Sequence, residues 1–101
     1  MKFFYHSKNW KIESEFKLEV EKKIAFLQTK YNFFTESDEL HLNFELFKEL
    51  KCGLKAELFL FKLSKRINMH TKDDNVYKAI HQIINKIDAQ LIKVKEKLDN
   101  H

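Results

Sequence analysis

The sequence predicts an α+β fold of the order β-α-β-β-β-α, in which a four-stranded mixed sheet has two helices packed on one face. Two segments place apolar residues at steps of three and four, as amphipathic helices do. Four further segments are β-prone or alternate apolar with polar residues, as half-buried strands do. The chain has one Gly and no Pro in 101 residues, so we expect short connections between these elements.

The first strand and the first helix lie in the first third of the chain. Residues 2–7 are β-prone, and alternation sends their side chains to the two faces of a strand in turn. Residues 14–31 are predicted as a helix, with acidic residues near its start and Lys30 near its end, as the helix dipole favours. The apolar stripe of this helix consists of Phe16, Val20, Ile24, Leu27 and Tyr31.

Three more strands follow in the middle of the chain. Residues 40–47 alternate apolar with polar side chains and form the second predicted strand. Residues 51–53 contain the only glycine and are predicted as a hairpin turn, where a positive φ is most useful. Residues 56–61 form the third predicted strand, and a tight turn at residues 64–65 leads into a short fourth strand at residues 67–71.

Residues 74–98 are predicted as the last helix, close to 40 Å long at about 1.5 Å per residue, with Asp73 or Asp74 as its N-cap. Its buried stripe consists of Tyr77, Ile80, Ile83, Ile84, Ile87, Leu91, Val94 and Leu98. A crossover helix makes the first two strands parallel, and hairpins make the other pairs antiparallel. The strand residues predicted to lie beneath both helices are Phe3, Tyr5, Leu42, Phe44, Leu58, Leu60, Ile67 and Met69.

The opposite face of the sheet is predicted to stay open. Its apolar side chains are Phe4, Phe47, Phe59, Phe61 and Leu63, set among His41, Asn43, Glu45, Glu57 and Asn68. Aromatic residues on a sheet stack on bases in some RNA-binding domains, but the Lys/Arg-Gly-Phe signature of those domains is missing. We therefore predict a protein contact or weak self-association through Phe47, Phe59 and Phe61, with a shifted register as the alternative.

The residues give little support for catalysis, and we predict no enzyme, metal or cofactor. The carboxylates in residues 13–21 have the spacing of a solvated helix start. His6 and His70 are expected at the opposite end of the strands from His41, which argues against a three-histidine metal site. Cys52, the single cysteine, can form no internal disulfide; lysines around it could lower the pKa of its thiol, but it has no histidine partner in sequence.

The basic residues on the two helices are the main sequence evidence for a function, which is binding to an anionic partner. The net charge of +4 and a pI near 9.1 are compatible with an anionic partner. On the first helix Lys22, Lys23 and Lys30 lie away from the apolar stripe, with Phe26 between them. The last helix has a row with steps of 4, 3 and 4, formed by Lys86, Gln90, Lys93 and Lys97. Helices packed side by side would join these groups into one basic strip that meets RNA phosphates, although an ordinary solvated face is the alternative.

Motifs in both helices are shared with a known family. They are Ile12 before the first helix, the run Val20-Glu21-Lys22-Lys23-Ile24 with Leu27 and Tyr31, and then Tyr77-Lys78-Ala79-Ile80, Lys86, Gln90-Leu91, Lys93, Lys95 and Lys97. With these motifs the chain resembles the family of ribosome hibernation-promoting factors and ribosome-associated translation inhibitors. The resemblance spans nearly the whole chain, and the middle strands match in pattern only.

The resemblance implies a single ribosome-binding domain over residues 1–101. Its helical face would dock on the small ribosomal subunit near the decoding region and block messenger and transfer RNA, which inhibits bacterial translation in stress or stationary phase. The implied rRNA-binding residues are Lys22, Lys23, Lys30, Lys78, Lys86, Gln90, Lys93 and Lys97. The chain is most similar to the short type, so a separate small ribosome-dimerising factor is an expected partner.

Some positions depart from the family pattern. Ala89 and Ile92 stand where the family often has arginine, which would lower the affinity or shift the docking. His81 and Asn85 replace acidic residues and would raise the local potential. A general double-stranded-RNA-binding module and a protein-interaction module stay open as alternatives. The start of the chain is too weakly apolar for a signal peptide and no segment approaches a membrane span, so we expect a cytoplasmic protein.

Overall fold

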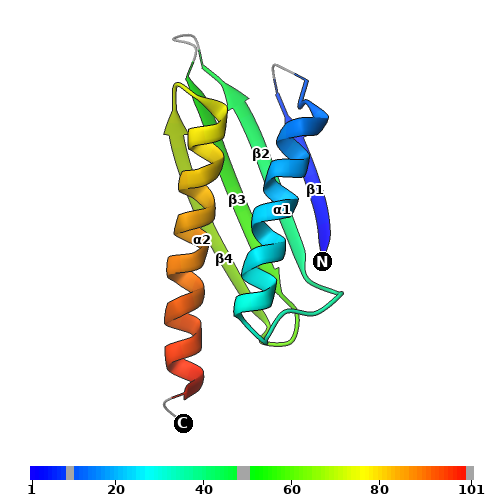
Figure 1. The fold of residues 1–101 in the computed structure, drawn as a ribbon, viewed down its shortest axis with the longest axis vertical. Helices are drawn as coiled ribbons and strands as arrows, with labels where there is room; N and C mark the ends of the chain where they lie inside the picture. Colours follow the sequence, from blue (N-terminus) through cyan, green and yellow to red (C-terminus); the bar gives the residue numbers. More distant parts are fainter. Residues whose placement is uncertain (9–10, 48–50, 100–101) are drawn as a thin grey trace.

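A computed structural model describes residues 1–8, 11–47 and 51–99 of the protein (Figure 1). The elements are β1 (Lys2–Ser7), α1 (Ser14–Lys30), β2 (Glu39–Leu46), β3 (Cys52–Leu60), β4 (Lys65–Asp73) and α2 (Val76–Asp99). The strands lie side by side in the order β1-β2-β3-β4, with β1 and β2 parallel and the other neighbours antiparallel. The predicted fold class is therefore confirmed.

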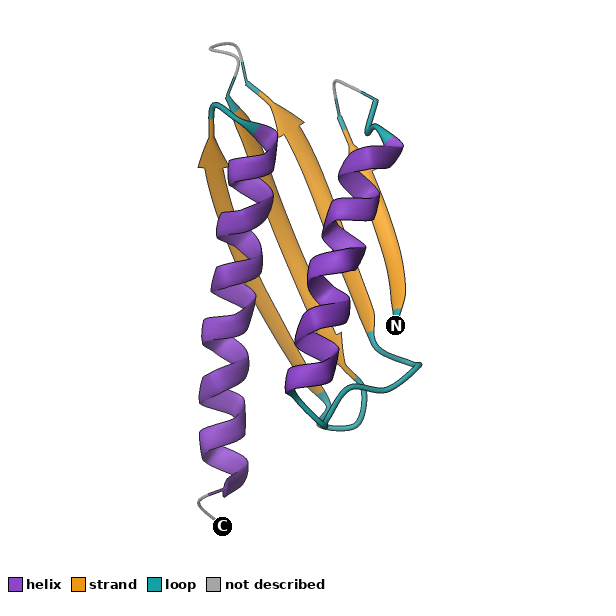
Figure 2. Cartoon of the chain, viewed as in Figure 1, coloured by secondary structure: helices purple, strands orange, loops and turns teal. Residues whose placement is uncertain are grey.

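Both helices cover the same face of the sheet, and α2 continues past the end of the strands towards its C-terminus (Figure 2). This overhang contributes to an elongated shape of 47 × 21 × 20 Å. None of the helices formed by the described residues combines the length and the apolar character that crossing a lipid bilayer requires.

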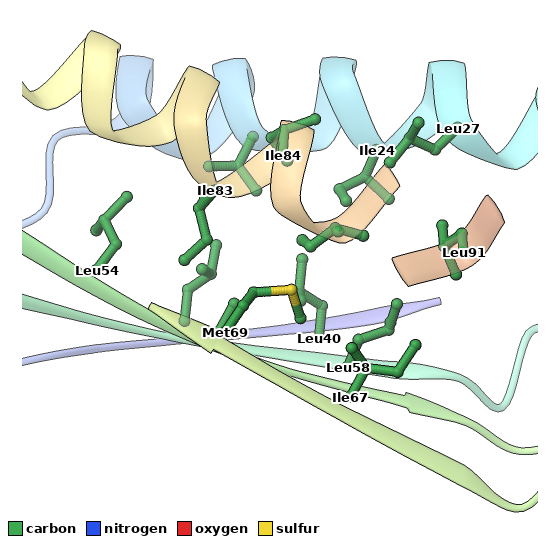
Figure 3. Close-up of a cluster of buried hydrophobic side chains, with 14 of the residues drawn as sticks. Ile24, Leu27, Leu40, Leu54, Leu58, Ile67, Met69, Ile83, Ile84 and Leu91 are labelled. Atoms are coloured by element: carbon green, nitrogen blue, oxygen red, sulfur yellow. The ribbon is translucent and has the colours of Figure 1, made fainter. Parts of the chain in front are cut away.

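The core lies between the helices and the covered face of the sheet, where side chains from all layers meet (Figure 3). In one cross-strand row Phe3 pairs with Leu40, and Leu40 pairs with Leu58, so alternation along each strand buries one side chain in two. The strand residues predicted to face the helices are all buried or, for Phe3 and Tyr5, half-buried. The predicted α2 stripe is buried except at its ends, where Tyr77 and Leu98 are 47% and 44% exposed.

Asp38 anchors one end of the sheet. Its side chain is fully buried and accepts hydrogen bonds from the Thr35 amide (2.7 Å), the Thr35 hydroxyl (3.0 Å) and the Phe61 amide (2.8 Å). Its carbonyl oxygen accepts a further hydrogen bond from the Lys2 amide at 2.8 Å. One residue therefore joins the loop before β2, the start of β1 and the turn after β3.

The only glycine has a different role from the predicted one. Gly53 lies within β3, opposite Glu45 of β2, and has no positive φ. A Cβ atom at this position would stand 2.6 Å from Cε2 of Phe47, so the glycine leaves room for that ring. The β2–β3 connection lies earlier: the Phe47 amide donates to the Lys51 carbonyl at 2.8 Å, and residues 48–50 are outside the described part.

The third strand starts at Cys52, earlier than predicted, and β4 and the start of α2 also differ from the prediction. The fourth strand is long rather than short: it starts directly after the turn that ends at Ser64, whose φ is 48°, and pairs with β3 as far as Asp73, opposite Cys52. The N-cap of α2 is Asn75, whose side-chain oxygen accepts from the Lys78 amide at 3.1 Å. Asp73 still belongs to β4 and accepts from the Asn75 amide at 3.0 Å, so it supports the cap from the preceding turn.

Candidate nucleic-acid interface

The predicted row of lysines on α2 lies on the side of that helix that faces β4. Lys86 reaches across to β4, where its Nζ atom donates to the His70 carbonyl at 2.6 Å. Gln90, Lys93 and Lys97 surround a shallow hollow of about 280 Å³ together with Lys65, the first residue of β4. We call these five residues, Lys65, Lys86, Gln90, Lys93 and Lys97, the β4 flank.

Hydrogen bonds fix α2 against β4 and so set the position of the β4 flank. The Thr71 hydroxyl donates to the side-chain oxygen of Gln82, and Thr71 itself is buried. The amide nitrogen of Gln82 donates in turn to Asp73 at 2.9 Å. Because these contacts lie one turn before Lys86, the lysines stand on a helix whose rotation about its axis is fixed.

The lysines of the β4 flank are accessible to an anion, although the Lys86 ammonium group also donates to the His70 carbonyl. Lys86, Lys93 and Lys97 are exposed, and Lys65 is half-buried. Within the described part of the chain none of these four ammonium groups forms an ion pair. From Lys86 to Lys97 the row extends along the helix for about 17 Å, at about 1.5 Å per residue.

The lysines of α1 lie on the other side of α2 and are partly neutralised. Lys23 stands 3.5 Å from Glu19 on its own helix, and Lys30 stands 3.0 Å from Asp88 of α2. The Tyr31 hydroxyl donates to the same Asp88 carboxylate. The helices do pack side by side, but α2 itself lies between the two groups of lysines.

The pKa values of the Asp88 cluster show how tightly it is held. Burial works to raise the pKa of Asp88, but the hydrogen bonds from Tyr31 and Lys30 and the Lys30 charge outweigh it and hold that pKa below its usual value. The hydrogen bond to Asp88 raises the pKa of Lys30, and burial followed by the contact with Asp88 raises the pKa of Tyr31. The carboxylate and the ammonium are therefore both charged and bound to each other.

A groove of about 360 Å³ runs between the two helices. We call it the helix groove; it is lined by Lys22, Lys23, Phe26 and Leu27 from α1 and by His81, Ile84, Asn85 and Asp88 from α2. Phe26 is 68% exposed at this groove. A hydrogen bond of 3.2 Å joins the Asn85 amide nitrogen and Nε2 of His81 one turn away. Lys78, the remaining lysine of the predicted set, is exposed in the first turn of α2.

On the open face of the sheet the three predicted phenylalanines do not form one surface. The rings of Phe59 and Phe61 are 6.5 Å apart, and Phe61 is 59% exposed. Phe47 lies near the other end of β2, where Lys72 Nζ is 4.3 Å from its ring centroid. Since Phe59 pairs with Glu39, eight residues before Phe47, the separation along the strand is about 26 Å at about 3.3 Å per residue. Leu63 packs against the core instead of lying on this face.

The histidines lie closer together than predicted. His6 pairs with Asn43, two residues along β2 from His41, and the rings of His6 and His41 are 6.1 Å apart. His70 lines the same shallow hollow of about 360 Å³. The expected separation was wrong because the parallel register of β1 could not be read from the sequence. Among the described residues no group of three or more His, Cys, Asp or Glu side chains could hold a metal ion.

Two further residues, Cys52 and Lys65, differ from what the sequence predicted for candidate sites. Cys52 is buried, and burial followed by the nearby Asp73 charge raises the pKa of its thiol, opposite to the predicted direction. Lys65 was missing from the predicted set because it begins a strand and shares no helical period with the α2 row. Only the β3–β4 pairing and the packing of α2 bring it beside Lys93 and Lys97.

Comparison with known proteins identifies the family. The family model described as Sigma 54 modulation protein / S30EA ribosomal protein matches residues 4–99, so the chain belongs to this family of ribosome-associated factors. The family resemblance inferred from the two helices is thereby confirmed. A comparison with curated protein sequences finds no significant match.

Solved structures share the fold. A ribosomal subunit interface protein from Coxiella burnetii is similar with a TM-score of 0.80 and 23% identity, over 95% of this chain and 99% of that chain. The N-terminal domain of Protein Y from Thermus thermophilus is similar with a TM-score of 0.78 and 18% identity, over 93% and 99% of the two chains.

Proposed function

We propose that the protein is a ribosome hibernation factor whose basic helical surface binds the small ribosomal subunit near the decoding region. There it blocks messenger and transfer RNA and inhibits translation in stress or stationary phase, by occupying the site and without catalysis. Membership of the family supports the ribosome as the partner. The name of the similar Coxiella burnetii protein supports a position at a subunit interface. The observation that carries the proposal is the β4 flank.

The geometry of the β4 flank suits a nucleic-acid backbone. Its ammonium groups are exposed or half-exposed, have no carboxylate partner among the described residues and stand in a row on a rigid helix. Such a row contacts phosphates, which position a protein on RNA and read its shape but not its bases. The full set that we propose for rRNA binding is Lys22, Lys23, Lys30, Lys65, Lys78, Lys86, Gln90, Lys93 and Lys97.

The α1 lysines should contribute less to RNA binding than the lysines of the β4 flank. Lys23 and Lys30 would have to share or leave Glu19 and Asp88 before they met a phosphate. Lys22 is exposed and is expected to contribute more than these two. With the ribosome as its partner we propose a cytoplasmic protein, and a separate small ribosome-dimerising factor as a second partner.

The test is the salt dependence of binding to purified small subunits, measured by sedimentation through sucrose gradients in a series of potassium chloride concentrations. Each phosphate neutralised by a lysine contributes a log-log slope of about 0.7 to 0.9, so the four lysines of the β4 flank predict a slope of about 3 to 4. A nearly flat dependence would contradict this docking. Free duplex RNA added as a competitor distinguishes the alternative. It would displace a general double-stranded-RNA-binding module from the subunits, but it would not displace a factor that recognises the ribosomal site.

A further inference from the structure

An exposed aromatic ring at the helix groove has no role in the core. Phe26 is 68% exposed on α1, whereas its groove neighbours Leu27 and Ile84 are buried. The apolar stripe of α1 that holds the helix on the sheet uses Val20, Ile24 and Leu27 instead. The fold therefore does not need a phenylalanine at position 26.

The helix groove combines three kinds of group that a nucleotide uses. Phe26 offers a ring, and Leu27 with Ile84 forms an apolar floor. The Asn85 amide is joined to His81 by one hydrogen bond and keeps an acceptor oxygen and a second N–H, the pair of groups with which an amide binds a base edge. Lys22 stands at the groove with an exposed ammonium group.

The charge of the groove favours an anionic occupant such as RNA over a neutral or basic protein segment. Asp88 also lines the groove, but its carboxylate is bound to Lys30 and Tyr31 and so repels an approaching phosphate weakly. Lys23 lies next to Lys22 and also lines the groove, but Glu19 partly neutralises it, so Lys22 is the main cation. A volume of about 360 Å³ gives room for one base with its sugar.

We propose that the helix groove receives an unpaired nucleobase of the RNA on which the β4 flank docks. The base stacks on Phe26, its hydrogen-bonding edge meets the Asn85 amide, and Lys22 meets an adjacent phosphate. This inference rests on the proposed function and adds a second kind of contact to it. Stacking on an aromatic side chain tolerates any base and changes affinity by about five- to a hundredfold.

The experiment compares Phe26→Ala with Leu18→Ala in binding to purified small subunits. Leu18 is a matched control because it is also 68% exposed on α1 but does not line the helix groove. We expect Phe26→Ala to weaken binding at least fivefold with an unchanged salt slope, since no charge is lost, and Leu18→Ala to stay within twofold of the parent. Thermal unfolding should show both variants folded.

A second variant identifies the occupant. Phe26→Trp in a Trp10→Phe background carries the only tryptophan of the chain, so its fluorescence reports on the groove. We expect near-parent affinity and quenching by protein-free small-subunit rRNA. If whole subunits quench this fluorescence and protein-free rRNA does not, although it binds, the occupant is a protein and the inference is wrong.

The outcomes also separate this inference from the proposed function. Parent-like binding of Phe26→Ala, with a steep salt dependence retained, would overturn base stacking and leave the proposed function standing. Failure of the parent chain to bind small subunits would overturn the proposed function and this inference together.

Discussion

The two sides of α2 carry similar residues in different situations. On the side that faces α1, Asp88 binds Lys30 at 3.0 Å and also accepts the Tyr31 hydroxyl. On the side that faces β4, Lys93 and Lys97 form no ion pair with any described residue. The lysines of α1 and α2 therefore have two roles: Lys30 joins α1 to α2, and Lys93 and Lys97 present positive charge to a partner. A count of lysines in the sequence does not distinguish these two roles.

The difference lies in what surrounds each ammonium group. Lys30 keeps 44% of its side-chain surface exposed, so solvent screens its ion pair with Asp88 and this pair contributes little to stability by itself. An ammonium group already bound to a carboxylate gains less from a phosphate than one surrounded by water. If this comparison is correct, changes on the β4 flank alter binding and changes at Asp88 alter stability.

The largest effect is expected for Lys86→Glu combined with Lys93→Glu. Two charge reversals facing phosphate replace attraction with repulsion, so affinity for small subunits should fall by well over tenfold and inhibition of translation in vitro should be relieved. Both side chains are exposed and only one hydrogen bond, from Lys86 to the His70 carbonyl, is lost, so the midpoint of thermal unfolding should change little. Binding is measured by sedimentation and folding by circular dichroism.

The matched control for this variant is a reversal on the other side of the same helix. Lys95 lies beside Lys30 and Tyr31, on the side that faces α1. Lys95→Glu should weaken binding clearly less than Lys93→Glu, although the two positions are only two residues apart. Equal losses would show that the charge of α2 as a whole matters and that its two sides do not differ.

The next effect concerns stability. Asp88→Ala removes the acceptor of both Lys30 and Tyr31, and leaves the buried Tyr31 hydroxyl with a weaker hydrogen bond to the Asp88 carbonyl at 3.5 Å. We expect a loss of about 1 to 2 kcal/mol in the free energy of unfolding, measured with urea. Subunit binding should be equal to the parent's or slightly tighter, because Lys30 becomes free. Glu96→Ala is the control: Glu96 is exposed, lines the hollow beside Lys93 and Lys97, and should leave stability unchanged when replaced.

A smaller effect follows from the lowered pKa of Asp88. The charged carboxylate is favoured in the folded state, so its contribution to stability is present above the unfolded pKa of about 3.9 and is lost as the pH falls through the folded pKa. The difference in stability between the parent and Asp88→Asn should therefore shrink as the pH is lowered below about 4. Solvent screening keeps this difference under about 1 kcal/mol. If the difference in stability between the parent and Asp88→Asn stayed constant below about pH 4, the charge of Asp88 would not be the source of the stabilisation.

Local patterns were sufficient for much of the fold. The steps of three and four identified the buried side of each helix, and alternation identified the covered face of β2 and β3, because both depend only on neighbours along the chain. Contacts between distant segments were not predicted. Asp38 bonds to Lys2, Thr35 and Phe61, and no periodic signal marks such a residue. Gly53 has its role because Phe47 lies across the hairpin.

In the candidate site, too, local patterns were predicted from the sequence and contacts between distant segments were not. The row from Lys86 to Lys97 was readable as a period, but its direction towards β4 and the addition of Lys65 depend on how α2 packs on the sheet. The pairing of Lys30 with Asp88, 58 positions apart, could not be read from either helix alone. The sequence therefore predicted which residues are basic and solvent-facing, and the structure shows which of them are already neutralised.

The smallest effect provides the most direct comparison of the two sides. Lys97→Ala removes an unpaired ammonium group, so the log-log salt slope for subunit binding should fall by about one. Lys30→Ala removes a charge that Asp88 already neutralises, so the slope should stay nearly constant, while the uncovered Asp88 carboxylate lowers affinity by a small factor at every salt concentration. The slopes are measured on the same preparation of small subunits. If both variants lower the slope equally, Lys30 leaves Asp88 on binding, and the two sides of α2 act as one surface towards RNA.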